Sequence, residues 1–240
     1  IAWAEVARRL AHEIKNPLTP IQLSAERLQM KLQPKLAGGD AELLERGTNT
    51  IVNQVVAMQQ MVDNFRDYAR TPPASLQPLD LNALIAEILE LYSSGEHLHV
   101  FRTNLQSNLP LVLGDATQMR QVVHNLLQNA QDAVVEVAEG QNPPDVVVST
   151  EAVHYADADG RDQTAVRLTV SDNGSGFNPK VMARAFEPYV TSKPKGTGLG
   201  LAVVKKIIEE HGVRIELQNR KDGKGAKVLI LLLNRASWLD

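Results

Sequence analysis

A histidine, a carboxylate and an amide lie within five residues of one another near the start of the chain, as His12, Glu13 and Asn16. Apolar residues recur around them in steps of three or four, which predicts one long amphipathic helix with a narrow seam. His12 is two residues from both Leu10 and Ile14 of that seam, about 160° from each at roughly 100° per residue. The imidazole is therefore expected to face water, where a reactant can reach it.

Two glycine clusters much later in the chain are candidates for phosphate binding, residues 172–176 (DNGSG) and 196–200 (GTGLG). Glycines let backbone N–H groups approach phosphate oxygens, and the second cluster opens a predicted helix whose N-terminus favours anions. Each cluster could also be a simple glycine-rich turn, because short glycine patterns are weak signals. A P-loop is excluded because its Gly-x-x-x-x-Gly-Lys-Ser/Thr pattern is absent. A dinucleotide-binding fold is also disfavoured, because Leu201 stands where its Gly-x-Gly-x-x-Gly pattern needs the third glycine.

Polar side chains elsewhere in this region suggest a metal ion and a nucleotide base. Asn125, Asn129 and Asp132, spaced four and three, form a polar strip along the edge of the apolar face of a predicted helix. The Asn129 carbonyl could ligate Mg²⁺, which prefers oxygen ligands and shares them with substrate phosphates, or it could be a satisfied structural amide. Asp172, at the predicted end of a strand, could cap a turn or accept a hydrogen bond from the exocyclic amine of a base.

Composition narrows the class of protein. The 25 basic and 28 acidic residues are scattered and give a net charge of −3, so direct binding of nucleic acid is disfavoured. The absence of cysteine excludes disulfides, thiolate nucleophiles and cysteine-based zinc sites. The longest apolar runs are far shorter than the roughly 18 residues that span a bilayer. Because the sequence starts partway into a helical pattern, at Ile1, we expect it to be a fragment of a longer protein.

The first domain is predicted over residues 1–70 as an α-helical hairpin. A helix to about Gln33 is followed by breaker and turn residues, and then by a second helix whose apolar residues form a heptad seam from Ile51. Two such narrow seams make too small a core alone, so we predict that two copies pair into a dimeric four-helix bundle. The alternative is that the hairpin lies on the second domain.

The second domain is predicted over residues 80–240, after an extended linker over residues 71–79 that is rich in proline. Its helical and strand patterns predict an α+β domain with helices on one face of a mixed sheet. The helix that carries Asn129 is predicted to open at Asp115, with Gln118 three residues later completing a capping box.

Taken together, these segments resemble the sensor histidine kinases over essentially the whole chain. Residues 12–18 (HEIKNPL) resemble the phosphoacceptor box of that family, and residues 18–21 with 186–193 resemble its nitrogen-regulation branch, of the NtrY type. The nucleotide-site boxes follow in the family's order: residues 125–130 (N box), 172–176 (first glycine box), 186–189 (F box) and 196–200 (second glycine box).

The resemblance implies a GHKL or Bergerat-type sandwich that uses ATP and Mg²⁺. It assigns the adenine to Asp172, Mg²⁺ to Asn129, and a place near the phosphates or the metal to Asn125. Residues 177–195 would form a lid over the nucleotide. The implied nucleotide-binding set is Asn125, Asn129, Asp132, Asp172, Gly174, Gly176, Phe186, Thr191, Lys193, Gly196, Thr197, Gly198, Leu199 and Gly200.

The same resemblance implies that the γ-phosphoryl group of ATP passes to His12 and then to an aspartate of a response-regulator receiver domain. Glu13 would be the base or would orient the imidazole, since a carboxylate on the other ring nitrogen fixes the tautomer. Asn16 would position water for the reverse, phosphatase reaction. The parent protein is expected to be a homodimer at the inner membrane, anchored through upstream regions, with this fragment in the cytoplasm.

Two other function classes would use the same nucleotide site. A GHKL-type ATPase or clamp would hydrolyse ATP without forming a phosphoprotein, which leaves His12 and Glu13 without a role. A catalytically silent dimeric scaffold would bind nucleotide and transfer no phosphoryl group.

Overall fold

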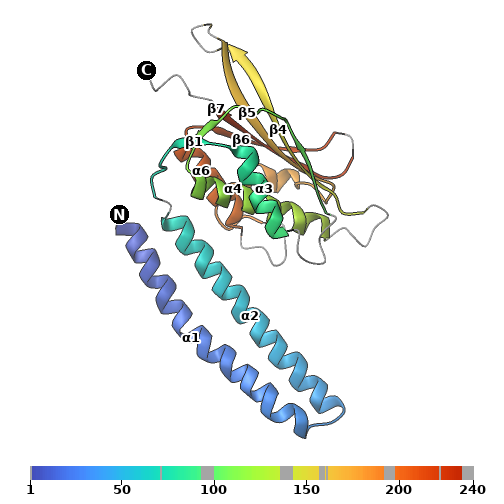
Figure 1. The fold of residues 1–240 in the computed structure, drawn as a ribbon. Coiled ribbons are helices and arrows are strands. Elements are labelled where there is room, and N and C mark those ends of the chain that lie inside the picture. The colour runs from blue at the N-terminus through green and yellow to red at the C-terminus, as the bar shows by residue number, and fades with distance from the viewer. Residues whose placement is uncertain are drawn as a thin grey trace. The chain divides into compact units, whose positions relative to one another are not determined.

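The structure is a computed structural model in which the chain divides into two compact units (Figure 1). One unit comprises residues 1–71 with 193–199, and the other comprises residues 72–192 with 200–240. The residues that the structure describes are 2–70, 72–92, 100–135, 143–156, 160, 162–191, 198–221 and 223–233.

The first unit is built on a hairpin of two long helices, α1 (Ala2–Leu32) and α2 (Gly39–Arg70), joined through the short 3₁₀ helix η1 (Gln33–Lys35) (Figure 1). Proline at the start of η1 removes the N–H that a continuing α-helix would need, so the first helix ends where the sequence predicts. Among the described residues, no helix combines the length and the apolar character needed to cross a membrane.

The apolar residues of α1 fall on two faces of the helix. Ala11, Leu18 and Ala25 are buried. The larger Ile21 and Leu28 of the predicted seam are 46% and 52% exposed. The sequence predicts one continuous seam, but the hairpin alone buries only part of it, and its larger side chains stay exposed.

The second unit contains a five-stranded sheet in the order β2-β4-β5-β7-β6, with β2 parallel to β4 and the other neighbours antiparallel. This mixed sheet confirms the predicted α+β class. A separate antiparallel pair joins β1 to β3. The strands are β1 (Gln77–Leu79), β2 (Phe101–Leu105), β3 (Val112–Gly114), β4 (Val146–Ala156), β5 (Asp162–Asp172), β6 (Arg214–Asn219) and β7 (Ala226–Leu233).

Three helices, α3 (Leu81–Tyr92), α4 (Ala116–Val135) and α6 (Gly200–Glu210), cover one face of the sheet (Figure 1). A single short turn, α5 (Pro179–Met182), lies between β5 and α6 in sequence. Burial alternates along β5 and β7, since every second side chain turns toward the helices. The core therefore fills the space between the helices and the sheet, and the carboxyl end of β5 lies beside α4.

The predicted capping box at the start of α4 is only half correct. Asp115 Oδ1 accepts hydrogen bonds from the backbone N–H groups of Thr117 and Gln118, each 3.0 Å long, which is the expected N-cap. The return bond from Gln118 does not form, because its Nε2 donates instead to the Pro72 carbonyl at 2.8 Å. The Asp115 N–H donates to Nε2 of His211, at 3.0 Å, just beyond the end of α6.

Candidate functional site

The polar strip of α4 borders the beginning of α6. Asn129 and Asn125 are half-buried, one turn apart on α4. A Cβ atom built on Gly200 would lie 3.4 Å from Asn129 Nδ2 and 3.6 Å from its Oδ1, so the amide faces the first residue of α6 directly. The structure thus brings together two residues that are 71 positions apart, counted from 129 to 200, as the predicted phosphate and metal site requires.

Asp172 ends β5 as a buried carboxylate, 5% exposed. Its Oδ1 accepts hydrogen bonds from the backbone N–H groups of Gly174, at 2.9 Å, and Ala226, at 3.2 Å. These bonds fix the carboxylate in one orientation. One oxygen therefore caps the turn, as one of the two alternatives from the sequence predicts. The contact of this acceptor-only group with a nucleotide base stays a prediction.

Gly174 lies against the backbone of α4. A Cβ at this position would meet the Ala133 carbonyl oxygen at 2.5 Å, a separation that no side chain tolerates. Ala133 follows Asn129 by about one turn of the helix. The first glycine box is therefore needed for close packing of the β5 end on α4, which places Asp172 next to the asparagine strip.

Gly225 packs against the backbone of Asp172, and the sequence alone indicates only a turn at this glycine. Its φ is +130°, and a Cβ there would overlap the Asp172 carbonyl oxygen. The only signal in the sequence was the glycine-rich turn before the last strand, which looks like any hairpin connection. Its contact with the backbone of β5 depends on the pairing of β5 with β7, which no local pattern reveals.

The segment predicted as a lid is anchored at its start and near its middle. The Asn219 side chain accepts from the Phe177 N–H at 2.7 Å and donates to the Phe177 carbonyl at 2.9 Å. Further along, the Lys205 ammonium of α6 lies 5.5 Å from the centre of the half-buried Phe186 ring, a cation–π contact. Neither Asn219 nor Lys205 stands out in the sequence, because each belongs to an element predicted only as a strand or a helix.

Asp132 turns toward a different neighbour from the glycines. Its Oδ1 accepts from Gln128 Nε2 at 2.9 Å. Burial, and secondarily the Asp132 charge, raise the pKa of Tyr92 to about 12. The Tyr92 hydroxyl lies 2.8 Å from His124 Nδ1. Asp132 therefore belongs to the side of α4 that faces α3, and its predicted nucleotide contact stays a prediction.

His12 is exposed on α1, as its spacing predicts. The Glu13 carboxylate accepts a 3.0 Å hydrogen bond from Arg9 Nε, one turn earlier on the helix. One turn after His12, Lys15 Nζ lies 2.7 Å from Asp63 Oδ2 of α2, which ties the two helices together beside the histidine. This pair was not predicted, because the register of the hairpin sets it. Asn16 is exposed.

Of the predicted site residues, Lys193, Gly196 and Thr197 lie outside the described residues. The predicted lid, residues 177–195, is described from Phe177 to Thr191. Thr191 is exposed and Leu199 is fully buried. Gly198 has φ of +67° and Gly176 has φ of +73°, both in the left-handed region.

The donor set beside Asn129 fits a magnesium ion that is shared with substrate. Within the described part of the chain, no group of three or more histidine, aspartate or glutamate side chains could hold a metal ion. Mg²⁺ takes oxygen ligands and usually has only one or two from the protein, with waters and substrate phosphates supplying the rest, so the Asn129 amide oxygen is chemically suited to be one of them. A permanent, all-protein metal site is not what these residues form.

Comparison with known families gives two matches that follow one another along the chain. The model for the "His Kinase A (phospho-acceptor) domain" matches residues 2–73. The model for the "Histidine kinase-, DNA gyrase B-, and HSP90-like ATPase" matches residues 114–236. The second match covers more than half of the chain and contains Asn129, Asp172 and Gly200.

Individual proteins agree with these matches. The nitrogen regulation protein NtrY of Azorhizobium caulinodans is 41% identical over 231 residues, which are 96% of this chain and 29% of that protein. The sensory histidine kinase/phosphatase NtrB of Rhodobacter capsulatus is 32% identical over 217 residues, 89% of this chain and 58% of that protein. The chain thus spans less than two thirds of these relatives.

A solved structure, full-length ShkA in complex with AMPPNP, matches with a TM-score of 0.64 and 25% identity, over 97% of this chain and 46% of that one. Both the helical hairpin and the ATPase-like sandwich therefore have counterparts in one known protein. The chain belongs to the sensor histidine kinases, as a catalytic core of the NtrY type.

Proposed function

We propose that this chain transfers the γ-phosphoryl group of ATP to His12 and then passes it to an aspartate of a response-regulator receiver domain. The observation that carries the proposal is the convergence of Asp172, Asn129 and Gly200 on one site in a chain that also displays an exposed histidine on a phosphoacceptor-type hairpin. One chain has use for both a nucleotide site and an exposed histidine if ATP bound at the site donates its phosphoryl group to His12.

The nucleotide site supports ATP binding in three ways. The fixed Asp172 carboxylate offers an acceptor to the exocyclic amine of adenine. The N-terminus of α6 presents backbone N–H groups, which favour phosphate. Asn129 would hold Mg²⁺, which neutralises phosphate charge when it is bound. Lys205 and Asn219 hold the lid segment at Phe186 and Phe177 beside this site.

At His12 the proposed step is a substitution at phosphorus. The unprotonated nitrogen of a neutral imidazole attacks the γ-phosphorus, a P–N bond forms, the bond to the bridging oxygen breaks, and ADP leaves with that electron pair. Glu13 would hold the proton on the other ring nitrogen as positive charge develops. It must exchange its bond to Arg9 for one to the imidazole, which costs little because both side chains are more than half exposed.

Phosphatase activity is the finer part of the proposal. Asn16 is exposed and follows His12 by about one turn of α1, so both side chains can face the same incoming partner. An amide there can orient a water molecule toward the acylphosphate of the partner's aspartate. The relative NtrB is a sensory histidine kinase/phosphatase by name, and we extend the second activity to this chain.

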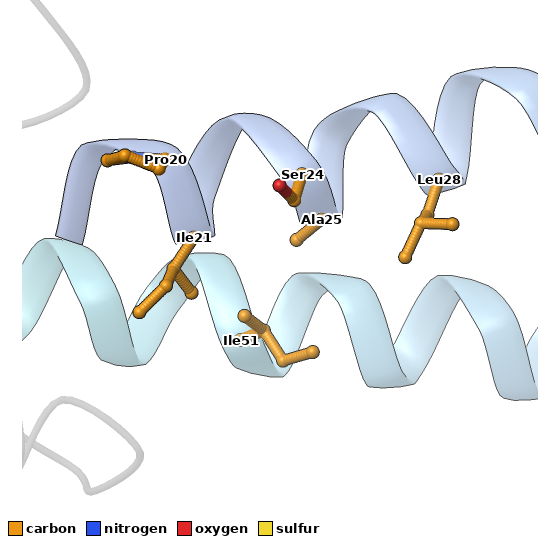
Figure 2. Close-up of a pocket in the computed structure, with 6 residues that line it drawn as sticks. All are labelled: Pro20, Ile21, Ser24, Ala25, Leu28 and Ile51. Carbon is orange, nitrogen blue, oxygen red and sulfur yellow. The ribbon is translucent and has the colours of Figure 1, made fainter. Parts of the chain in front are cut away.

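A second copy of the chain is the proposed cover for the hairpin. Figure 2 shows Ile21, Ala25 and Leu28 of α1 beside Ile51 of α2. These residues line an open apolar groove with a volume of about 330 Å³. The exposed halves of both seams continue this surface, with Leu10, Ile14 and Met58 each at least 41% exposed. An identical hairpin would bury these residues in a four-helix bundle.

Leu28→Asp is expected to convert the dimer into a monomer, since a carboxylate at the centre of the bundle would be buried without a partner. Analytical ultracentrifugation at micromolar concentration measures the change. The matched control is Leu23→Asp, because Leu23 is 57% exposed and lies two residues after Ile21, about 200° around the helix. If both variants remain dimeric, the seam is not the interface.

His12→Gln is expected to abolish phosphorylation of the protein while leaving ATP affinity within about twofold, since the nucleotide residues are untouched. The measurement is incubation with γ-labelled ATP and Mg²⁺, followed by acid and base treatment, because a phosphoramidate is labile in acid and stable in base. His154→Gln is the matched control, an exposed histidine on β4 that should keep full label.

Each outcome of this labelling assay separates the function classes. Label that survives in His12→Gln contradicts the assigned acceptor. Release of phosphate from ATP with no labelled protein would favour the ATPase or clamp, and ATP binding with neither reaction would favour the silent scaffold.

A further inference from the structure

The linker after the hairpin is held by the first turn of α4. Gln118 Nε2 donates to the Pro72 carbonyl at 2.8 Å, and Asp115 Oδ2 accepts from the Ser75 N–H at 3.0 Å. Gln118 is only 4% exposed, whereas Pro72 and Ser75 are exposed. The linker thus lies on the surface of the second unit, and a buried side chain reaches out to hold it. We call these two hydrogen bonds the linker clamp.

The clamp residues are set firmly in their own domain. Asp115 is the N-cap of α4, and its N–H is taken by His211, whose Nδ1 donates to the Ile207 carbonyl of α6 at 2.8 Å. The Gln118 N–H, followed by the N–H groups of Ser75 and Thr117, lowers the pKa of Asp115, so the carboxylate stays an acceptor at neutral pH. The anchor is therefore rigid.

One half of the Gln118 amide is left unsatisfied. Its Oε1 is buried and has no hydrogen-bond partner within the described residues. A glutamine freed from Pro72 could satisfy both ends in water, so the bond to the linker gains little net free energy. The clamp is thus a weak interaction in net free energy, so the linker can be released from it.

The clamp shortens the tether between the two units. Helix α2 ends at Arg70, and the first linker residue that the clamp holds is Pro72, two peptide steps later. Without the clamp, the first residue fixed by the domain is Gln77, in β1, paired with Gly114 and seven steps from Arg70. At about 3.5 Å per residue, the maximum reach grows from about 7 Å to about 25 Å.

We propose that Gln118 and Asp115 are positioning residues for phosphoryl transfer, because the linker clamp sets the length of the tether between His12 and the ATP domain. This inference rests on the proposed function. Once a tether is long enough for the two sites to meet, a shorter one gives a higher effective concentration of the ATP domain around the histidine, so release of the clamp lowers it. Effective concentration falls roughly as the −3/2 power of tether length, so seven steps in place of two predict a fall of up to about sixfold.

Gln118→Leu tests the proposal, since leucine fills the buried site and cannot donate to Pro72. We expect hydrogen exchange in the peptide covering residues 72–79 to accelerate at least about tenfold, and the rate of His12 phosphorylation at saturating ATP to fall up to about sixfold. The dissociation constant for ATP should stay within about twofold. Gln121→Leu, a substitution of the same kind one turn later on α4, should change none of these.

Two further variants separate tether length from local damage. Ser75→Pro removes the second hydrogen bond from the linker side and leaves α4 intact, so it remains informative if Gln118→Leu does not fold. Five residues inserted between Thr71 and Pro72 of the parent chain give seven steps with the clamp in place, and should reproduce the loss. In Gln118→Leu the same insertion should cost only about twofold more, since twelve steps replace seven.

The outcomes are distinct from those of the proposed function. Accelerated exchange in Gln118→Leu with an unchanged or raised phosphorylation rate overturns the proposal, and so does unchanged exchange. Equal, additive losses from the insertion in both backgrounds overturn it as well. Absence of label in the parent chain contradicts the proposed function instead, while the exchange measurement still reports whether the clamp exists.

Discussion

Asp172→Asn is expected to weaken ATP binding by about 10- to 150-fold with little loss of stability. The asparagine Oδ1 can accept the same hydrogen bonds from the N–H groups of Gly174 and Ala226, so the turn remains capped. What is lost is the negative charge of the proposed acceptor for the adenine amine, and hydrogen bonds to charged groups contribute about 1.5–3 kcal/mol. Titration calorimetry with ATP measures the loss, and thermal unfolding checks the fold.

The base itself supplies the control for this experiment. Inosine triphosphate carries a carbonyl in place of the exocyclic amine, so the parent should bind it far more weakly than ATP. In Asp172→Asn that preference should shrink or disappear. Asp172→Ala should behave differently, because two buried N–H groups lose their partner at about 1–3 kcal/mol each, and the domain itself should be destabilised. A full preference for ATP in Asp172→Asn would refute the adenine assignment.

Gly225→Ala is expected to destabilise the second unit by about 2–5 kcal/mol and to weaken ATP binding together with it. The added methyl group would overlap the Asp172 carbonyl oxygen, and a φ of +130° disfavours any residue with a Cβ. Overpacking costs about 1–3 kcal/mol, and an unfavourable backbone conformation adds about 1–2 kcal/mol. Urea denaturation measures the loss of stability.

Gly223→Ala is the matched control for this steric prediction. Gly223 lies in the same turn, and a Cβ there would meet nothing within 4 Å. We expect its effect on stability to be within about 0.5 kcal/mol, as for an ordinary surface change. Equal stability of the two alanine variants would mean that Gly225 does not support Asp172 in the way the structure indicates.

The sequence predicted this fold well where local chemistry decides it. Asp80 begins α3 by accepting from the Ala83 N–H, and Asn178 begins α5 by accepting from the Lys180 N–H, in line with the general preference of aspartate and asparagine for the N-cap position. Gly212, with φ of +65°, follows the end of α6, where a glycine in the left-handed region commonly terminates a helix. Capping and helix termination depend on residues that are close in sequence, so the positions of helix ends can be predicted from the sequence alone.

Predictions failed where distant segments compete for the same group. The capping box at Asp115 was incomplete because Pro72 and His211, which lie 46 and 96 positions from their partners, took the donors. Gly225 and Asn219 gained their roles from strand pairing. The predicted seam of α1 is only partly buried, because α2 covers only part of it. Tertiary contacts of this kind have no local pattern.

The imidazole of His211 gives the second unit an internal spectroscopic probe. The Asp115 N–H can only donate and the Ile207 carbonyl can only accept, so the ring must be neutral, with its proton on Nδ1. That proton is buried between α4 and α6, the two helices that carry Asn129 and Gly200. Its nuclear magnetic resonance signal, and the tautomer that the ring nitrogens report, therefore record whether the two helices are joined at this end of the nucleotide site.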